Sequence, residues 1–308
     1  MVALPDMLPV LLSLGSIPVS SFGVFLALGF LVGVFLIWRL SRAWDLDEEN
    51  ILDLILLTFL GGLVGARLYF GLENLSFFAA NPLKIILINK QPGFSFWGAI
   101  LGGWLTLYAF ARTKKVDFWL VADIASVGFL GGLILADLGC FLGGCDIGIQ
   151  SRLPLAVNMV GAIGKRFPTQ LLEALLLLIV LLRIWSTAIH FHPRGKIISL
   201  SLIYIGIIKF LMEPLKQQHN EGVFLSAVLF FLGMTIFYRS SKRNAVTDFK
   251  NAGFQVYKLV TNSESRTFAL DRFKKYCYNQ KTSVAWKLRN FKKTLRRFNV
   301  RFSYKNSG

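Results

Sequence analysis

Long apolar runs separated by short polar segments dominate the first 238 residues of the chain. A membrane core about 30 Å thick is crossed by about 20 mostly apolar residues in a helix. Seven stretches meet this requirement, to within several residues at each end: 22–40, 51–72, 95–111, 118–142, 170–189, 197–215 and 222–238. Strands of a membrane barrel would instead alternate apolar and polar residues in steps of two. The pattern therefore predicts an all-α integral membrane protein, a bundle of about seven transmembrane helices.

Composition agrees with this prediction and divides the chain into two regions. Hydrophobic residues make up 54% of the chain, above the level of about 45–50% that is typical of soluble proteins. Residues 239–308 contain 18 Lys or Arg and three acidic residues, so this segment carries +15 of the net charge of +17. We therefore expect a transmembrane domain over residues 1–238 and a basic, partly helical cytoplasmic tail over residues 239–308.

Within the tail, apolar residues recur at steps of three and four, with Lys and Arg between them. The apolar positions are Leu288, Phe291, Leu295, Phe298 and Phe302. This pattern predicts a basic helix that lies in the membrane interface and contacts anionic headgroups. A solvated tail without fixed structure is the alternative. Binding to ribosomal RNA is less favoured, so we expect no nucleic-acid partner.

The distribution of Lys and Arg predicts the orientation of the spans. The tail places the C-terminus in the cytoplasm, and seven spans then place the N-terminus outside, together with the loops near 73–94 and 143–169. The segment before Arg39 contains no Lys or Arg, so it lacks the charged start of a signal peptide.

Ionisable residues interrupt the apolar runs, and each is costly in lipid unless it is paired or functional. They are Asp53, Arg67, Asp123, Asp137, Glu173, Lys209 and Glu213. Mutual ion pairing inside the bundle is the structural alternative for any single one of them. Arg67 and Lys209 form the sharper pair, because two cations that face one cavity could hold a phosphate group.

Cysteine and histidine give weaker signals. Three cysteines do not make a disulfide framework, and we expect Cys140 and Cys145 to be small packing residues. His190, His192 and His219 fall at the ends of spans and are predicted to be interface residues. No spacing indicates a metal site, so we expect neither metal nor cofactor.

Six segments, in order along residues 8–238, resemble the prolipoprotein diacylglyceryl transferases of bacterial membranes. The segments are Pro9–Gly15 with Ser21–Gly23, Gly61–Phe70, Gly93–Gly102, Ala136–Gly148, Phe167–Glu173 and Ile205–Glu213. The fourth resembles the family signature G-R-x-G-N-F-x-N-x-E, the fifth its H-P-[ST]-Q-L-Y-E and the sixth its Y-G-x-x-R-x-x-x-E. The resemblance implies seven spans in the orientation given above.

The resemblance also implies an activity: transfer of a diacylglyceryl group from phosphatidylglycerol to the lipobox cysteine thiol of prolipoproteins, in the plasma membrane. The implied partners are phosphatidylglycerol and prolipoprotein signal peptides. By position in the motifs, phosphatidylglycerol is expected to contact Arg67, Lys209, Gln170 and Gly148. The acids expected to orient these groups or accept a proton are Asp137, Glu173 and Glu213.

Several motif positions depart from the family pattern. Trp97 replaces a histidine, Asp137 replaces the signature arginine, and Cys140, Gly143 and Cys145 replace two asparagines and a glutamate. These changes leave open a catalytically silent relative that binds lipid or a lipoprotein precursor. A small-solute transporter is a further alternative, but the chain shows no internal repeat or paired broken helices.

Overall fold

The computed structural model describes residues 10–14, 17–79, 93–159, 162–217, 222–241 and 244–262, with isolated positions between 267 and 290. The chain divides into two compact units, Met1–Lys242 and Arg243–Gly308. Each unit is described by itself below.

The first unit is built from long helices, one for each predicted span. They are α1 Ser21–Ala43, α2 Glu48–Glu73, α4 Phe96–Thr113, α5 Phe118–Gly143, α6 Thr169–Ala188, α7 Lys196–Met212 and α8 Gly222–Ser241. A short α3, Leu75–Ala79, follows α2, and the 3-10 turn η2, Glu213–Leu215, extends α7. The all-α class is confirmed.

Six helices in the described part of the chain are long and apolar enough to cross a membrane. The seventh predicted span is α4, which falls short because its 18 residues include Trp97, Trp104, Arg112 and several glycines. The protein is therefore a multi-pass membrane protein.

Polar side chains define where several helices begin. Ser20 accepts a hydrogen bond from the backbone N–H of Gly23 at the start of α1. Asp47 caps α2, and Asp117 caps α5 through the N–H groups of Trp119 and Leu120. Such caps satisfy N–H groups that have no partner inside the helix.

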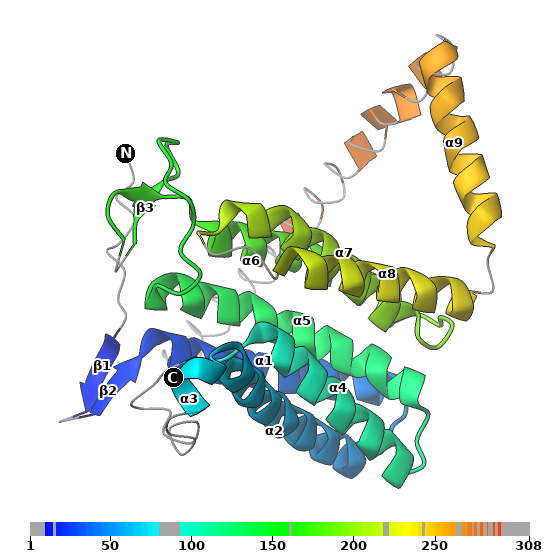
Figure 1. The fold of residues 1–308 in the computed structure, drawn as a ribbon. Helices are drawn as coiled ribbons and strands as arrows, with labels where there is room; N and C mark the ends of the chain where they lie inside the picture. The colour runs from blue at the N-terminus through cyan, green and yellow to red at the C-terminus, as the bar shows by residue number, and fades with distance from the viewer. Residues whose placement is uncertain are drawn as a thin grey trace, which may run out of the picture. The chain divides into compact units, whose positions relative to one another are not determined.

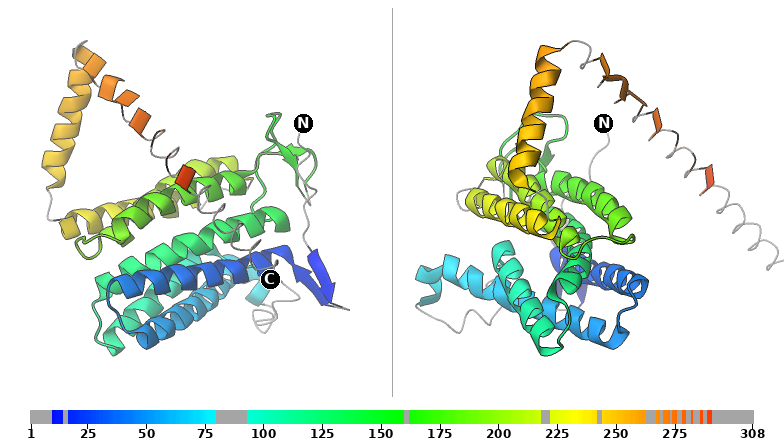
Figure 2. Two further views of the ribbon diagram at one scale, coloured as in Figure 1. Left: turned by 180° about the vertical axis from the view of Figure 1, so that it is seen from behind. Right: turned by 90° about the vertical axis from the view of Figure 1, so that its right-hand side faces the viewer.

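Helix α5 is central to the bundle. It contacts α1, α4, α6 and α7, while α2 packs against α4 and α7 against α8. The views agree that α1, α2, α4 and α5 lie alongside one another, with α6, α7 and α8 grouped on the other side of α5 (Figure 1 and Figure 2). This topology places α5 between the two groups of helices.

Glycines allow the closest of these helix contacts. A Cβ atom added to Gly65 of α2 would lie 2.5 Å from the carbonyl oxygen of Gly98 in α4. One added to Gly29 of α1 would lie 2.9 Å from the carbonyl oxygen of Gly132 in α5. Small residues at such crossings let helix backbones approach closely in lipid.

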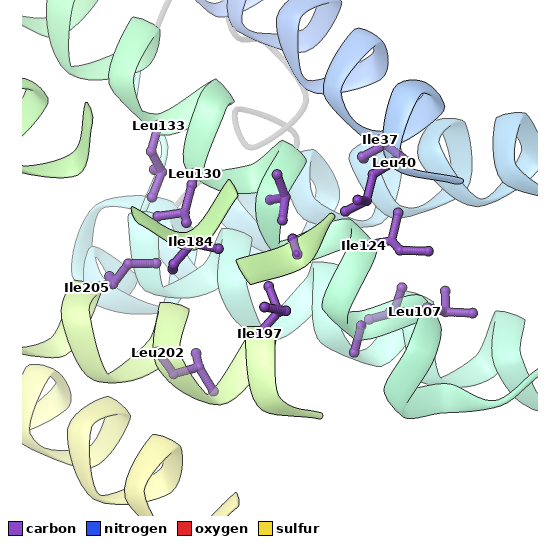
Figure 3. Close-up of a cluster of buried hydrophobic side chains, with 14 of the residues drawn as sticks. Ile37, Leu40, Leu107, Ile124, Leu130, Leu133, Ile184, Ile197, Leu202 and Ile205 are labelled. Carbon is purple, nitrogen blue, oxygen red and sulfur yellow. The ribbon is translucent and has the colours of Figure 1, made fainter. Parts of the chain in front are cut away.

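The apolar core is formed largely by α5, α6 and α7. Figure 3 shows part of it, including Leu130, Ile184, Ile197 and Ile205, whose side chains gather between these helices. The same core extends to Leu107 of α4 and thereby joins the two groups of helices.

Two short antiparallel hairpins were not predicted. Strands β1, Val10–Leu14, and β2, Ile17–Ser20, pair before α1, and strands β3, Val157–Asn158, and β4, Lys165–Arg166, pair within the loop before α6. They lie outside the long apolar runs and are too short to produce a clear alternating pattern.

The second unit begins with α9, Ala245–Thr261, on which Phe254 and Tyr257 are exposed. The predicted interfacial helix falls almost entirely outside the described residues, as do all five of its apolar positions. Its membrane contact stays a prediction.

Candidate functional site

A cavity of about 480 Å³ lies within the first unit, lined by residues of α1, α2, α4, α5, α7 and α8. This volume is within the range of ordinary ligand sites, about 300–1,000 Å³. Most of the lining is apolar, and charged side chains gather where α5 and α7 end: Asp137, Asp146 and Lys209. The cavity therefore has a long apolar part and a polar end.

Lys209 and Glu173 form a buried ion pair at this polar end. The Lys209 Nζ atom lies 2.6 Å from Glu173 Oε2, and the two side chains are 7% and 2% exposed. The same Nζ lies 4.7 Å from the centre of the Phe96 ring, which adds a cation–π contact. Lys209 lines the cavity, whereas Glu173 supports it from α6 behind the cavity wall.

Lys216 joins three acidic groups of this region into one network. Its Nζ lies 3.1 Å from Asp146 Oδ2, 3.4 Å from Glu173 Oε1 and 3.4 Å from Glu213 Oε2. Sequence reasoning missed Lys216, because it follows the last residue of the predicted span 197–215. Its only signal was its position three residues after Glu213.

Charge within this network shifts the pKa values of its two members outside the spans. Burial would raise the pKa of Asp146, but the charges of Lys216 and Lys209 and the hydrogen bond from Lys216 outweigh it, so the pKa is lowered. Burial and the charge of Lys209 would lower the pKa of Lys216, but the three carboxylates outweigh both and raise it. Lys216 and Asp146 are therefore held as a charged pair.

Asp137 differs from the other acids. It is nine-tenths buried and lines the cavity, yet no hydrogen-bond donor among the described residues reaches its Oδ2 atom. Buried polar atoms nearly always have a partner. Asp137 is thus the one predicted acid that both faces the described cavity and has a free acceptor.

Arg67 lies elsewhere. Its Nη1 donates to the Gly93 carbonyl oxygen at 2.8 Å, and its guanidinium lies 5.6 Å and 5.8 Å from the ring centres of Phe70 and Phe78. Arg67 is not among the residues that line the described cavity. Arg67 is instead surrounded by these aromatic rings, and its predicted convergence with Lys209 on one phosphate site stays a prediction.

Gln170 and Gly148 shape the loop beside the polar end. Gln170 Nε2 donates to the carbonyl oxygens of Cys145 and Asp146, the latter at 2.8 Å. Gly148 forms a β-bridge with Lys216, and an added Cβ there would collide with the backbone of Phe167. Both residues hold the loop in place behind the described cavity. Their predicted contact with phosphatidylglycerol stays a prediction.

Cys140 and Cys145 are joined by a disulfide bond, so the reading of these residues as packing cysteines is wrong. Gly144 adopts the left-handed conformation, with φ 76°, and ends α5. The chain turns back there, which brings the two Cα atoms to 5.0 Å, within the usual range for disulfides. Both residues line the polar end of the cavity.

The remaining charged residues within spans have structural partners. Asp53 pairs with Lys114 at 3.2 Å on the exposed surface. Asp123 accepts from the backbone N–H groups of Gly195 and Ile198 at 2.7 and 2.8 Å, and so caps α7. Across the described ranges, no three His, Cys, Asp or Glu side chains gather as a metal-ion site would require.

Comparison with known proteins gives a consistent result. Residues 9–239 match the family model described as prolipoprotein diacylglyceryl transferase. A protein of Geobacter sulfurreducens is 30% identical over 257 residues, which cover 78% of this chain and 97% of that protein. A relative from Desulfotalea psychrophila is 30% identical, and the match covers 79% of this chain and 97% of that protein. A relative from Clostridium tetani is 26% identical, and the match covers 75% of this chain and 97% of that protein. All three are named phosphatidylglycerol–prolipoprotein diacylglyceryl transferase.

Proposed function

Because the chain belongs to the prolipoprotein diacylglyceryl transferase family, we propose that it transfers a diacylglyceryl group from phosphatidylglycerol to the lipobox cysteine thiol of prolipoproteins. In this reaction the sulfur forms a bond to the glycerol carbon of the diacylglyceryl group. The bond from that carbon to the phosphate oxygen breaks, and glycerol phosphate leaves with the electron pair. The proton of the thiol passes to water, so that atoms and charges balance.

The observation that carries the proposal is a largely apolar cavity whose polar end contains Lys209. The apolar part suits acyl chains, and a cation at the polar end suits the phosphate. As the leaving group departs, the Lys209 ammonium would stabilise the negative charge that develops on it. A nearby cation would also favour the thiolate form of the acceptor, whose ordinary pKa is about 8.5.

The acids divide into two roles. Asp137 lines the cavity, which supports a direct contact with a bound donor or acceptor. Glu173 and Glu213 act through the two lysines that they neutralise, Lys209 and Lys216. Arg67, Gln170 and Gly148 would support the donor site from outside the described cavity.

The direct test is a transfer assay. Purified protein in phosphatidylglycerol vesicles should add the mass of one diacylglyceryl group to a lipobox peptide, and nothing to the same peptide with serine in place of cysteine. Lys209→Met should reduce the rate by about 10²–10³-fold, as is typical for loss of one electrostatic stabiliser. Lys209→Arg should retain activity, because it keeps the cation.

Lys114→Met is the matched control, since it removes a lysine from an exposed ion pair with Asp53. Its transfer rate should equal that of the unchanged protein. Absence of any diacylglyceryl adduct would refute the transferase. Binding of phosphatidylglycerol without transfer would support a catalytically silent relative of the family. The changes at Trp97, Asp137, Cys140 and Cys145 leave that alternative open.

We further propose that the protein lies in the bacterial plasma membrane with its N-terminus outside and its tail in the cytoplasm. Support comes from the concentration of Lys and Arg in residues 239–308. The tail would then meet the anionic cytoplasmic leaflet and bind its surface.

A further inference from the structure

The Oδ2 atom of Asp137 is a buried acceptor that the described protein does not satisfy. Burial deprives it of water, and an acceptor without a donor is unfavourable in an apolar setting. Because Asp137 also lines the cavity, a bound molecule that brings a hydrogen-bond donor to this point would remove the penalty.

The cavity limits what that molecule can be. Its lining is mostly apolar along α1, α2, α4 and α5, so an entirely polar ligand would leave most of this surface unused. The polar end combines an unsatisfied acceptor, Asp137, with a cation, Lys209. This arrangement fits a lipid that carries both an anionic group and a hydrogen-bond donor in its headgroup.

Charge at the polar end determines where the anionic group and the hydrogen-bond donor of the lipid lie. Four acids, Asp137, Asp146, Glu173 and Glu213, outnumber the two lysines, Lys209 and Lys216. The ion pairs among the described residues join these lysines to Asp146, Glu173 and Glu213. An anionic phosphate placed against Asp137 would be repelled, so the phosphate belongs beside Lys209 and the donor beside Asp137.

We propose that Asp137 accepts a hydrogen bond from a hydroxyl of the donor lipid's glycerol headgroup and so determines headgroup specificity. This rests on the proposed function for the identity of the lipid. A carboxylate that accepts from sugar hydroxyls in dinucleotide-binding proteins performs the same recognition. Specificity built on such a bond is strong, because a lipid without the hydroxyl leaves the acceptor unsatisfied again.

The test compares two lipids with the same tails and charge in a binding competition read by native mass spectrometry, without acceptor peptide. Phosphatidylglycerol has two headgroup hydroxyls, whereas phosphatidylpropanol has none. The unchanged protein should prefer phosphatidylglycerol by about tenfold or more, the usual range for a hydrogen bond to a charged group. Asp137→Ala should bind both lipids equally, and Asp137→Asn, which keeps one carbonyl acceptor and the size of the side chain, should retain part of the preference.

Asp53→Ala is the control, because Asp53 lies in an exposed pair with Lys114; it should keep the full preference. Equal binding of the two lipids by the unchanged protein would overturn the proposal, as would a preference that survives in Asp137→Ala. Stronger binding of phosphatidylethanolamine than of phosphatidylglycerol would overturn it in favour of an ammonium donor. If Asp137→Ala does not fold, the Asp137→Asn comparison decides.

The transfer assay on the same preparation separates this proposal from the activity. Headgroup preference without transfer would sustain the role of Asp137 and refute the transferase. Transfer without headgroup preference would support the transferase and refute the proposed role of Asp137.

Discussion

Individual buried charges in this protein are mostly neutralised by an identifiable partner. Glu173 illustrates the principle, because it contacts both Lys209 and Lys216 with a side chain that is only 2% exposed. Breaking such a buried pair typically costs about 3–5 kcal/mol, whereas an exposed pair such as Asp53–Lys114 contributes about 0–1 kcal/mol. The network around Glu173 is therefore a structural support for the cavity as well as a part of the proposed site.

His192 should make stability depend on pH. Both ring nitrogens face acceptors: Nδ1 lies 2.8 Å from the His190 carbonyl oxygen and Nε2 lies 3.5 Å from Asp123 Oδ2. Burial and the charge of Lys196 would lower the pKa of His192, but the hydrogen bonds with Asp123 and His190 and the charge of Asp123 outweigh them and raise it. Protonated His192 therefore stabilises the folded state. The stabilisation is complete below the unfolded-state pKa of about 6.5 and is lost as pH rises through the folded-state pKa.

The measurement is the thermal unfolding midpoint in detergent between pH 6 and pH 9, roughly the range over which a raised histidine pKa falls. The midpoint should decrease with rising pH in the unchanged protein, and His192→Gln should remove this dependence. His190→Gln, which changes a neighbouring exposed ring while keeping the backbone acceptor, should keep it. A midpoint that rises over this interval would contradict the assignment.

The individual residues show what a sequence can and cannot reveal about a site. Among the described residues, the polar network and cavity have six charged members. Four of them, Asp137, Glu173, Lys209 and Glu213, were found from sequence because charge is rare within apolar runs, and Asp146 and Lys216 were missed. Lys216 escaped because it lies just beyond a span. The aromatic surroundings of Arg67 could not be predicted, since they depend on how α2 is rotated against its neighbours.

At the scale of elements, the helices were predictable because a span needs a long apolar run. The predicted stretch 118–142 became α5, Phe118–Gly143, and 51–72 became α2, Glu48–Glu73. The two hairpins and the disulfide were not, because they depend on local turns and on contacts that leave no periodic signal. The polar end of the cavity is built around such a turn, at Gly144.

Close packing of α2 against α4 gives a prediction at this scale. A Cβ atom at Gly102 would collide with the backbone of Gly61 and Gly65, whereas one at Gly103 would meet nothing nearer than 3.8 Å. Gly102→Ala should therefore lower the stability of the bundle by about 1–3 kcal/mol, the usual cost of overpacking. Thermal unfolding in detergent measures it.

Gly103→Ala is an almost ideal control, because it adds the same atom to the next residue of the same helix. It should leave stability unchanged or slightly improved, since alanine favours helix over glycine. Equal effects of the two substitutions would mean that the α2–α4 contact is looser than the structure indicates.

On the scale of the whole molecule, membrane orientation links the site to its substrates. The polar end of the cavity lies where α5 and α7 end, on the same side as the loop 143–169. If that side is outside, the cavity's polar end opens towards the compartment in which a disulfide such as Cys140–Cys145 persists. The same proposed orientation has the basic residues 239–308 in the cytoplasm.

Labelling with a membrane-impermeant maleimide on intact cells tests this orientation. Cys140 and Cys145 are bonded to each other, so Cys277 is the one native thiol available for labelling and reports the tail. It should react only after the cells are opened. In a Cys277→Ser background, Arg152→Cys in the 143–169 loop should react on intact cells, whereas Lys114→Cys, between α4 and α5, should need permeabilisation. Labelling of Cys277 on intact cells would place the tail outside and the polar end of the cavity on the cytoplasmic side. That result would contradict the proposed orientation, because a disulfide such as Cys140–Cys145 persists in an oxidising compartment and not in the cytoplasm.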